Sequence, residues 1–234
     1  MVGKGSCWLC HLGRIPYGAA WELQRKLARL RYEERIDDIL LVLEHPPTVT
    51  LGRFGRKDNL LITEKQAAER GISLYRSDRG GDITFHCPGQ LVVYPIMNIK
   101  SRRGKLRDFL TDLEEVAIET LNSYDVPAER WTEHPGIWVN GKQIGAVGLR
   151  ISRGVTLHGL SLNVSPELGR FNIINLCGLP GKEATSISQL AGRQVRVQDA
   201  ARRLENRFSE IFSVELLKIQ KRQVMEDSMD TEVL

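Results

Sequence analysis

Apolar residues recur at two spacings along this 234-residue chain, and each spacing predicts a type of element. Steps of three and four residues, as at Ala20, Leu23, Leu27 and Leu30, are typical of amphipathic helices. Such steps predict helices from 17 to about 34, from 106 to 121 and from 201 to 211. Continuous or alternating apolar runs predict strands before Leu12 and at 39–43, 48–51, 72–76, 91–99 and 155–163.

Two local motifs mark turns between these elements. Thr63 and Gln66 have the spacing of a capping box, which predicts a short helix ending near Gly71. Asn140-Gly141 lies between two short alternating runs and predicts a β-hairpin with a type I′ turn. No linker or internal repeat interrupts the interleaved strands and helices. The pattern therefore predicts one mixed α/β domain over 1–215, with a mixed sheet flanked by helices. The charged tail at 216–234 has no regular pattern and is expected to be mobile.

Composition and charge exclude several classes of protein. Hydrophobic residues make up 41% of the chain and charged residues 26%, which is ordinary for a soluble globular protein. A net charge of +4 favours an acidic partner but does not indicate nucleic acid. No run of 18 apolar residues predicts a membrane span, and we expect no signal or transit peptide. We therefore expect a cytoplasmic protein whose four cysteines stay reduced.

The N-terminal segment contains a motif that suggests a cofactor. Cys7, Cys10 and His11 match the C-x-x-C-H pattern of c-type haem attachment. Haem attachment takes place after export, and the sequence indicates no export. The same residues also suit a first β-strand leading to Leu12-Gly13, and we expect that strand instead.

The stretch from Arg79 to Pro95 has the features of a binding loop. Gly80 and Gly81 are adjacent, so the main chain there can approach a ligand closely. A short β-like run follows and ends at His86, just before a Pro-Gly turn. The pattern indicates a binding site without identifying the ligand.

Four segments carry residues suited to catalysis: the loop with His86, the hairpin with Lys142, the strand with His158, and Cys177-Gly178. A cysteine followed by glycine suits a nucleophile, because the glycine lets backbone N–H groups face the reacting atom. A nearby ammonium lowers the pKa of a thiol, so a Cys/Lys or Cys/His pair implies acyl transfer through a thioester.

Other interpretations of these cysteines and histidines compete with Cys177 as a nucleophile. Cys87 competes as a nucleophile because it follows His86, and any lone cysteine can equally be a small buried hydrophobe. A metal site built from Cys87, His86, Cys177 and His158 is disfavoured, because no C-x-x-C pair lies among them.

The chain resembles a known family in six segments that occur in the family's order. They are Leu12-Gly13 with Tyr17, Glu44–Pro47 with Thr50–Gly52, Arg79–Gln90, Gly136–Val139 with Gly145–Arg150, His158–Asn163, and Cys177-Gly178 with Thr185-Ser186. In these residues the chain is similar to the octanoyltransferases of lipoate synthesis, also called lipoate-protein ligase B. The resemblance covers residues 7 to 190 without large gaps.

The resemblance implies a fold, a reaction and its partners. The fold would be that of the catalytic domain of biotin and lipoate protein ligases. The reaction would move an octanoyl group from acyl carrier protein to a lysine of a lipoyl domain. Acceptors would be the E2 subunits of 2-oxoacid dehydrogenases and the glycine-cleavage H protein. No ATP, other cofactor or metal is implied, and neither nucleic acid nor a membrane is expected as a partner.

The resemblance also implies roles for individual residues. Cys177 would be the acyl-thioester nucleophile. The acyl site would be lined by Arg79, Gly80, Gly81, Asp82, Ile83, Thr84, Phe85, His86, Ala146, Val147, Gly148, Gly159, Leu160 and Ser161. Two other functions stay open: an ATP-dependent lipoate ligase, and a non-catalytic binder of acyl carriers or lipoyl domains.

The chain departs from the family pattern at three positions. Cys87 stands where a glycine is usual, and Leu176 where a proline is usual. The family's activating lysine normally lies five residues before the glycine at Gly148, which here is Gln143.

Lys142 is one residue earlier, and adjacent strand residues point to opposite faces. A bulge could restore the direction of Lys142, His158 or His86 could act instead, or the role of the protein could differ. We expect Lys142 to be the partner of Cys177, with Gln143 as an accessory residue.

Overall fold

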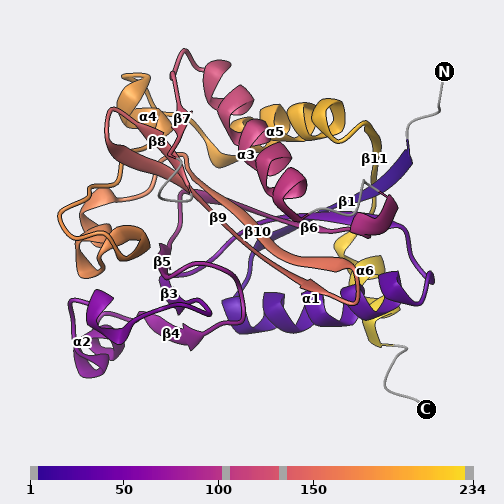
Figure 1. The fold of residues 1–234 in the computed structure, drawn as a ribbon, viewed down its shortest axis with the longest axis horizontal. Coiled ribbons are helices and arrows are strands. Elements are labelled where there is room, and N and C mark those ends of the chain that lie inside the picture. Colours follow the sequence, from indigo (N-terminus) through magenta and orange to yellow (C-terminus); the bar gives the residue numbers. More distant parts are fainter. Residues whose placement is uncertain (1–4, 102–105, 132–135, 230–234) are drawn as a thin grey trace.

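The computed structural model describes residues 5–101, 106–131 and 136–229 of the chain (Figure 1). The helices are α1 Tyr17–Tyr32, α2 Glu64–Glu69, α3 Leu106–Asn122, α4 Ile187–Leu190, α5 Val197–Ile211 and α6 Lys221–Met229. The strands are β1 Gly5–Arg14, β2 Asp38–Glu44, β3 Thr48–Leu51, β4 Ser73–Arg76, β5 Ile83–His86, β6 Gln90–Ile96, β7 Glu129–Arg130, β8 Ile137–Val139, β9 Lys142–Ser152, β10 Val155–Asn163 and β11 Val214–Lys218. Among the described residues, no helix combines the length and apolar character needed to cross a membrane.

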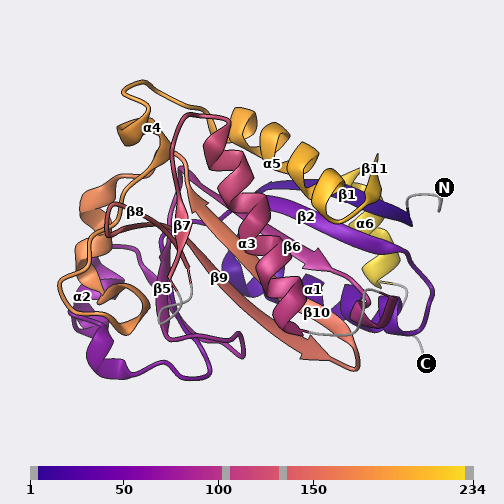
Figure 2. The same ribbon diagram turned by 45° about the horizontal axis from the view of Figure 1, so that its top comes forward.

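An eight-stranded mixed sheet forms the centre of the domain. Its strand order is β11-β1-β2-β6-β10-β9-β8-β7, with parallel pairs at β11-β1-β2 and antiparallel pairs elsewhere. Helices α3 and α5 cover one face, while α1 and α6 lie against the other (Figures 1 and 2). The expected mixed sheet flanked by helices is therefore confirmed.

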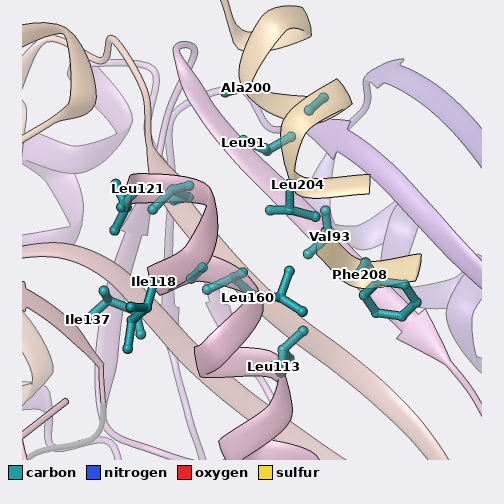
Figure 3. Close-up of a cluster of buried hydrophobic side chains, with 14 of the residues drawn as sticks. Leu91, Val93, Leu113, Ile118, Leu121, Ile137, Leu160, Ala200, Leu204 and Phe208 are labelled. Atoms are coloured by element: carbon teal, nitrogen blue, oxygen red, sulfur yellow. The ribbon is translucent and has the colours of Figure 1, made fainter. Parts of the chain in front are cut away.

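The main core lies between the sheet and helices α3 and α5 (Figure 3). Leu113 and Leu121 of α3 and Leu204 of α5 are 0% exposed and face Val93 and Leu160 of the sheet. Alternate residues of the central strands enter the opposite core under α1, so both faces of the sheet are buried. This double burial makes the central strands rigid supports for any site built on them.

A second sheet, of order β4-β3-β5, lies beside the large one. It has its own apolar cluster, which includes Val49, Phe85 and Phe171. The short helix α2 packs next to it and begins with the predicted capping box, since Thr63 and Gln66 bond each other's backbone N–H. The chain passes from β5 directly to β6, and so from the small sheet to the large one.

The N-terminal motif is a strand, as predicted. Cys7 packs in the core under α3 and α5, whereas Cys10 packs in the core under α1. Because the two sulfur atoms lie on opposite faces of the sheet, they cannot bond one haem.

Residues 216–229 of the C-terminal tail, for which the sequence showed no regular pattern, include the end of β11 and helix α6. Strand β11 pairs with β1, and helix α6 inserts Val224, 1% exposed, into the core under α1. The backbone N–H of Ile219 also bonds the carbonyl of Leu9. The expected boundary at 215 therefore falls inside β11, while residues 230–234 of the predicted tail lie outside the described residues.

Removing a buried side chain from the main core tests this packing. Leu204→Ala should lower the free energy of unfolding by about 2–5 kcal/mol, because it leaves a cavity between α5 and the sheet. Leu217→Ala is the matched control, since Leu217 is 41% exposed on β11 and its loss should cost under about 0.5 kcal/mol. Urea unfolding of both variants measures the difference, and equal losses would contradict the assigned core.

Candidate active site

A pocket lies between the large and small sheets, on the α1 side of the large sheet. Residues that line it are Tyr17, Arg79, Gly81, Asp82, Ile83, Thr84, His86, Val92, Tyr94, Ala146, Val147, Gly148, His158, Gly159, Leu160, Ser161 and Cys177. Its floor is made of small side chains on two paired strands, because Ser161 is opposite Ala146 and Gly159 is opposite Gly148. Short side chains on adjacent strands leave room for a ligand above the sheet.

Arg79 is the buried cation of this pocket. Its Nε donates to Thr50 Oγ1 at 2.9 Å, and Nη2 donates to the carbonyl oxygens of Thr50 at 2.6 Å and Asp82 at 2.8 Å. Nη1 donates to the carbonyl of Gly80 at 2.9 Å. All four acceptors are neutral oxygen atoms, so these bonds hold the guanidinium without cancelling its charge. Burial lowers the pKa of Arg79.

Two buried histidines near the pocket are held as neutral rings. His86 Nδ1 is 2.7 Å from Gln90 Oε1, which can only accept, so Nδ1 carries the proton and Nε2 is the acceptor. Burial lowers the pKa of His86 well below its usual value. His45 is bonded to the carbonyl of Ile15 and to the hydroxyl of Tyr94, and burial lowers its pKa to about 4. Neither ring therefore adds positive charge near pH 7.

His158 has a carboxylate partner. Its Nε2 lies 2.7 Å from Asp78 Oδ1, and Arg150 binds the other oxygen of the same carboxylate. The backbone of His158 is left-handed, with a φ of 61°, and its N–H donates to Gln24 Oε1 at 2.6 Å. The ring is thus fixed at the wall of the pocket.

Cys177 reaches the pocket from a tight turn, Leu176–Gly178. Its backbone is left-handed, with φ 52° and ψ 24°, which is uncommon for a residue with a side chain. Burial raises the pKa of the thiol, while the Gln143 hydrogen bond and the charge of Arg79 act in the opposite direction and Asp82 raises it further. The resting sulfur is therefore a protonated thiol at neutral pH.

The side chain beside the sulfur is Gln143. Its Nε2 donates to Cys177 Sγ at 2.8 Å, and its own main chain is bonded to Glu183 and Thr185. Lys142 points outward instead: Nζ lies 2.6 Å from Glu183 Oε2, and the side chain is 48% exposed. The geometry thus places Gln143, and not the expected Lys142, at Cys177.

A β-bulge explains this exchange. Trp138 is opposite Gln143, but Ile137 is opposite Gly145, so β9 has one extra residue at Ile144. Since Ala146 and Gly148 face the pocket, uninterrupted alternation would turn Ile144 and then residue 142 toward it. The bulge buries Ile144 in the main core and gives the pocket-facing place to Gln143. The bulge considered from the sequence exists, but it does not restore Lys142.

Most of the predicted site residues do meet in this pocket. Four of them do not line it. Lys142 points outward, and Gln143 reaches the pocket only through its bond to Cys177. The N–H of Gly80 bonds the carbonyl of Leu149 at 2.9 Å, and Phe85 packs on Phe171 in the small-sheet core. Sequence reasoning missed Tyr17, Val92 and Tyr94 as site residues. The alternate positions of Val92 and Tyr94 on one strand were a usable signal.

Cys87 is not a rival nucleophile in this geometry. It is 1% exposed within the apolar cluster of the small sheet, and burial raises its thiol pKa to about 12.

Comparison with known proteins identifies relatives of this chain. The family model described as the lipoyl protein ligase A/B catalytic domain matches residues 16–209. The octanoyltransferase of Maridesulfovibrio salexigens is 41% identical over 202 residues, which cover 86% of this chain and 94% of that protein. The octanoyltransferase of Chloroflexus aggregans is 42% identical over 207 residues, which cover 87% and 94%.

Solved structures with low sequence identity share the fold. A bi-partite lipoate protein ligase from Thermoplasma acidophilum superimposes with a TM-score of 0.71 at 16% identity, covering 97% of this chain and 91% of that one. Biotin protein ligase from Aquifex aeolicus, solved with biotin and ATP, superimposes with a TM-score of 0.51 at 16% identity, covering 88% of this chain and 70% of that one. The predicted resemblance to the biotin and lipoate ligase fold is confirmed.

The fold and the matched residues define the class: the chain belongs to the lipoyl protein ligase A/B catalytic-domain family. Within that family it is a member of the octanoyltransferases, which are acyltransferases. The family resemblance predicted from the six ordered motifs is thereby confirmed.

The turn that carries Cys177 depends on a close contact at Gly178. A Cβ at position 178 would lie 2.6 Å from Asp82 Oδ2, whereas a Cβ at Gly181 would meet nothing within 4 Å. Both glycines have a positive φ, at 77° and 73°, so alanine costs backbone strain at both. Gly178→Ala should therefore lower the free energy of unfolding by about 1–3 kcal/mol more than Gly181→Ala in urea titrations. Equal effects would show that the contact with Asp82 is unimportant.

The protonation of Cys177 should respond to residue 143 and not to residue 142. Gln143→Lys places an ammonium near Sγ, so the thiol pKa should fall by about one unit or more. Alkylation by iodoacetamide follows the thiolate, so its rate profile should move to lower pH by the same amount. Lys142→Ala is the control and should leave the profile unmoved, because Lys142 bonds Glu183. A profile that moved in Lys142→Ala would restore Lys142 as the activating residue.

Proposed function

We propose that the protein moves an octanoyl group from a carrier-bound thioester to a lysine of a lipoyl domain, and that Cys177 holds the group in between. The observation that carries this proposal is the position of Cys177 Sγ. It lies at a pocket with a floor of small residues, beside the amide of Gln143 and the buried charge of Arg79. An acyl chain fits such a floor, and charge that develops at a thioester carbonyl is favoured near the guanidinium.

In the first step, the sulfur of Cys177 attacks the carbonyl carbon of the donor thioester. The new C–S bond forms to Cys177, and the C–S bond to the carrier breaks. The proton that Cys177 loses ends on the departing carrier thiol, so atoms and charge balance. Arg79 stabilises the negative charge that passes through the carbonyl oxygen, and Gln143 donates to the attacking sulfur.

In the second step, the neutral amine of the acceptor lysine attacks the acyl-Cys177 carbonyl. An amide bond forms, the C–S bond to Cys177 breaks, and a proton from the amine returns to the sulfur. Exchange between two thioesters is nearly neutral in energy, while conversion of a thioester to an amide is downhill. The pair of steps therefore needs no ATP.

We further propose the partners that this chemistry requires. The donor is octanoyl-acyl carrier protein, and the acceptors are lipoyl domains of 2-oxoacid dehydrogenase E2 subunits and the glycine-cleavage H protein. Support comes from family membership and from a pocket open to Cys177. We also propose a cytoplasmic setting, supported by four cysteines that are free thiols in the structure.

Intact mass spectrometry tests the covalent intermediate. Mixing the protein with octanoyl-acyl carrier protein should add one octanoyl group, and Cys177→Ala should abolish the adduct. Cys87→Ser is the matched control and should keep the adduct, because Cys87 is buried away from the pocket. Adding a lipoyl domain should discharge the adduct and acylate the lysine.

Three results would count against the proposal. An adduct that survives Cys177→Ala would place the nucleophile elsewhere. Acylation of the lipoyl domain only with free octanoate and ATP would indicate a ligase. Binding of carrier or lipoyl domain without any transfer would indicate a non-catalytic binder.

A further inference from the structure

A tight turn at Gly52–Gly55, named here the Phe54 turn, presents an aromatic ring to solvent. Phe54 is 71% exposed, more than any other large apolar side chain among the described residues. Exposing an aromatic ring of this size is unfavourable in a monomer, and an exposed apolar group with a polar rim often marks a binding surface.

The turn is held firmly against the Arg79–Asp82 loop. The N–H groups of Gly52, Arg53 and Phe54 donate to the carbonyls of Asp82, Arg79 and Gly81 at 2.7, 2.8 and 3.2 Å. The chains approach so closely that a Cβ on Gly52 would lie 2.4 Å from the carbonyl oxygen of Gly81. The Phe54 ring is therefore carried on a fixed backbone and loses little freedom when it binds a partner.

Asp82 joins the Phe54 turn to the nucleophile. Its carboxylate accepts from Arg56 N at 3.2 Å and from Asn59 Nδ2 at 2.9 Å. The Cβ position of Gly178, next to Cys177, lies 2.6 Å from the same carboxylate. The segment from 52 to 59 and the Cys177 turn therefore contact the same carboxylate, which places the Phe54 turn near the segment that carries Cys177.

The charge around Phe54 is positive. Arg53 flanks the ring and has no carboxylate within ion-pair distance among the described residues. Arg56 and Lys57 follow, but their pairs with Asp58 and Glu64 are long, at 3.5 and 3.8 Å, and highly exposed. Such surface pairs are weak and leave the cations available to a partner.

A largely apolar groove adjoins the Phe54 turn. Leu51, Leu60, Ile62 and Leu74 line it, and its charged residues are Lys57, Arg76 and Glu64. The Cβ position of Gly55 is 3.0 Å from Leu51 Cβ, so the Phe54 turn borders the groove. An apolar strip with cations at its rim matches the composition of protein-binding hot spots, in which aromatic residues and arginine predominate.

We propose that the Phe54 turn, Arg53 and the adjoining groove form the docking site for an acidic acyl-carrier domain that delivers the thioester to Cys177. The inference rests on the proposed function. The cations distinguish the donor from the acceptor. A carrier arm is joined to its domain through an anionic phosphodiester, whereas the acceptor brings a lysine that is itself cationic until it loses a proton. Positive charge at this mouth therefore attracts the donor.

The test compares two donors that carry the same thioester. Octanoyl-acyl carrier protein has the acidic domain and the phosphodiester, while octanoyl-pantetheine has neither. With the carrier below saturation, Phe54→Ala and Arg53→Ala should each slow formation of octanoyl-Cys177 by about tenfold. With octanoyl-pantetheine both variants should match the wild type within about twofold, because neither side chain touches the acyl pocket.

The matched control residues lie at the β11 end of the large sheet, in β11 and the helix α6 that follows it. Leu217→Ala removes an exposed leucine from β11, and Arg222→Ala removes an exposed arginine from α6. Both should retain wild-type rates with either donor. Added salt should slow the wild type with the carrier more than it slows Arg53→Ala, because it screens the attraction that Arg53 supplies.

Each contrary result has a distinct meaning. If the Phe54 and Arg53 variants react with the carrier at the wild-type rate, or lose the same factor with both donors, the docking site is overturned. Formation of octanoyl-Cys177 by the wild type would still uphold the proposed function in either case. Slower discharge to a lipoyl domain with unchanged acylation would assign the surface to the acceptor and overturn the proposal. Absence of an adduct in the wild type with either donor would overturn the proposed function itself.

Discussion

The site depends on one buried cation, Arg79. Burying a guanidinium without hydrogen bonds would cost several kcal/mol, and its four bonds to neutral oxygens offset much of that cost. Those bonds join β3 of the small sheet to the loop that leads into β5, and the next residue, Gly80, bonds Leu149 of the large sheet. The contact that aligns the two sheets therefore also brings positive charge to Cys177.

The bulge in β9 decides which side chain accompanies that charge. Gln143 donates a neutral N–H to the sulfur, whereas Lys142 forms an ion pair with Glu183 at the surface. A neutral donor favours a thiolate less than an ammonium does, so more of the electrostatic stabilisation at the sulfur falls to Arg79. Arrangement of the backbone, rather than the presence of a lysine in the hairpin, thus sets the chemistry of the site.

Sequence patterns predicted the parts of the fold that local chemistry determines. Examples are the apolar positions of α1, the apolar run of β2 and the Asn140-Gly141 turn, which follow from residues close together in the chain. A bulge was considered from the sequence, but its position at Ile144 could not be predicted, because Ile144 is apolar and suits either face. Two main-chain bonds to residues far along the sequence hold it: the N–H of Gln143 donates to the carbonyl of Glu183, and the N–H of Thr185 donates to the carbonyl of Gln143. The docking of β11 and α6 likewise depends on partners in the distant N-terminal strand.

A raised thiol pKa reduces the nucleophilic reactivity of Cys177 by less than it reduces the thiolate fraction. Below the pKa, each unit of increase cuts the thiolate fraction about tenfold, while the reactivity of each thiolate rises by about threefold. The net loss is therefore only about threefold per unit. Arg79 and Gln143 oppose the rise in pKa that burial causes, so they increase the thiolate fraction while the sulfur stays buried. In the proposed first step, a leaving carrier thiol of ordinary pKa would accept the proton from Cys177, so that step would require no strong base.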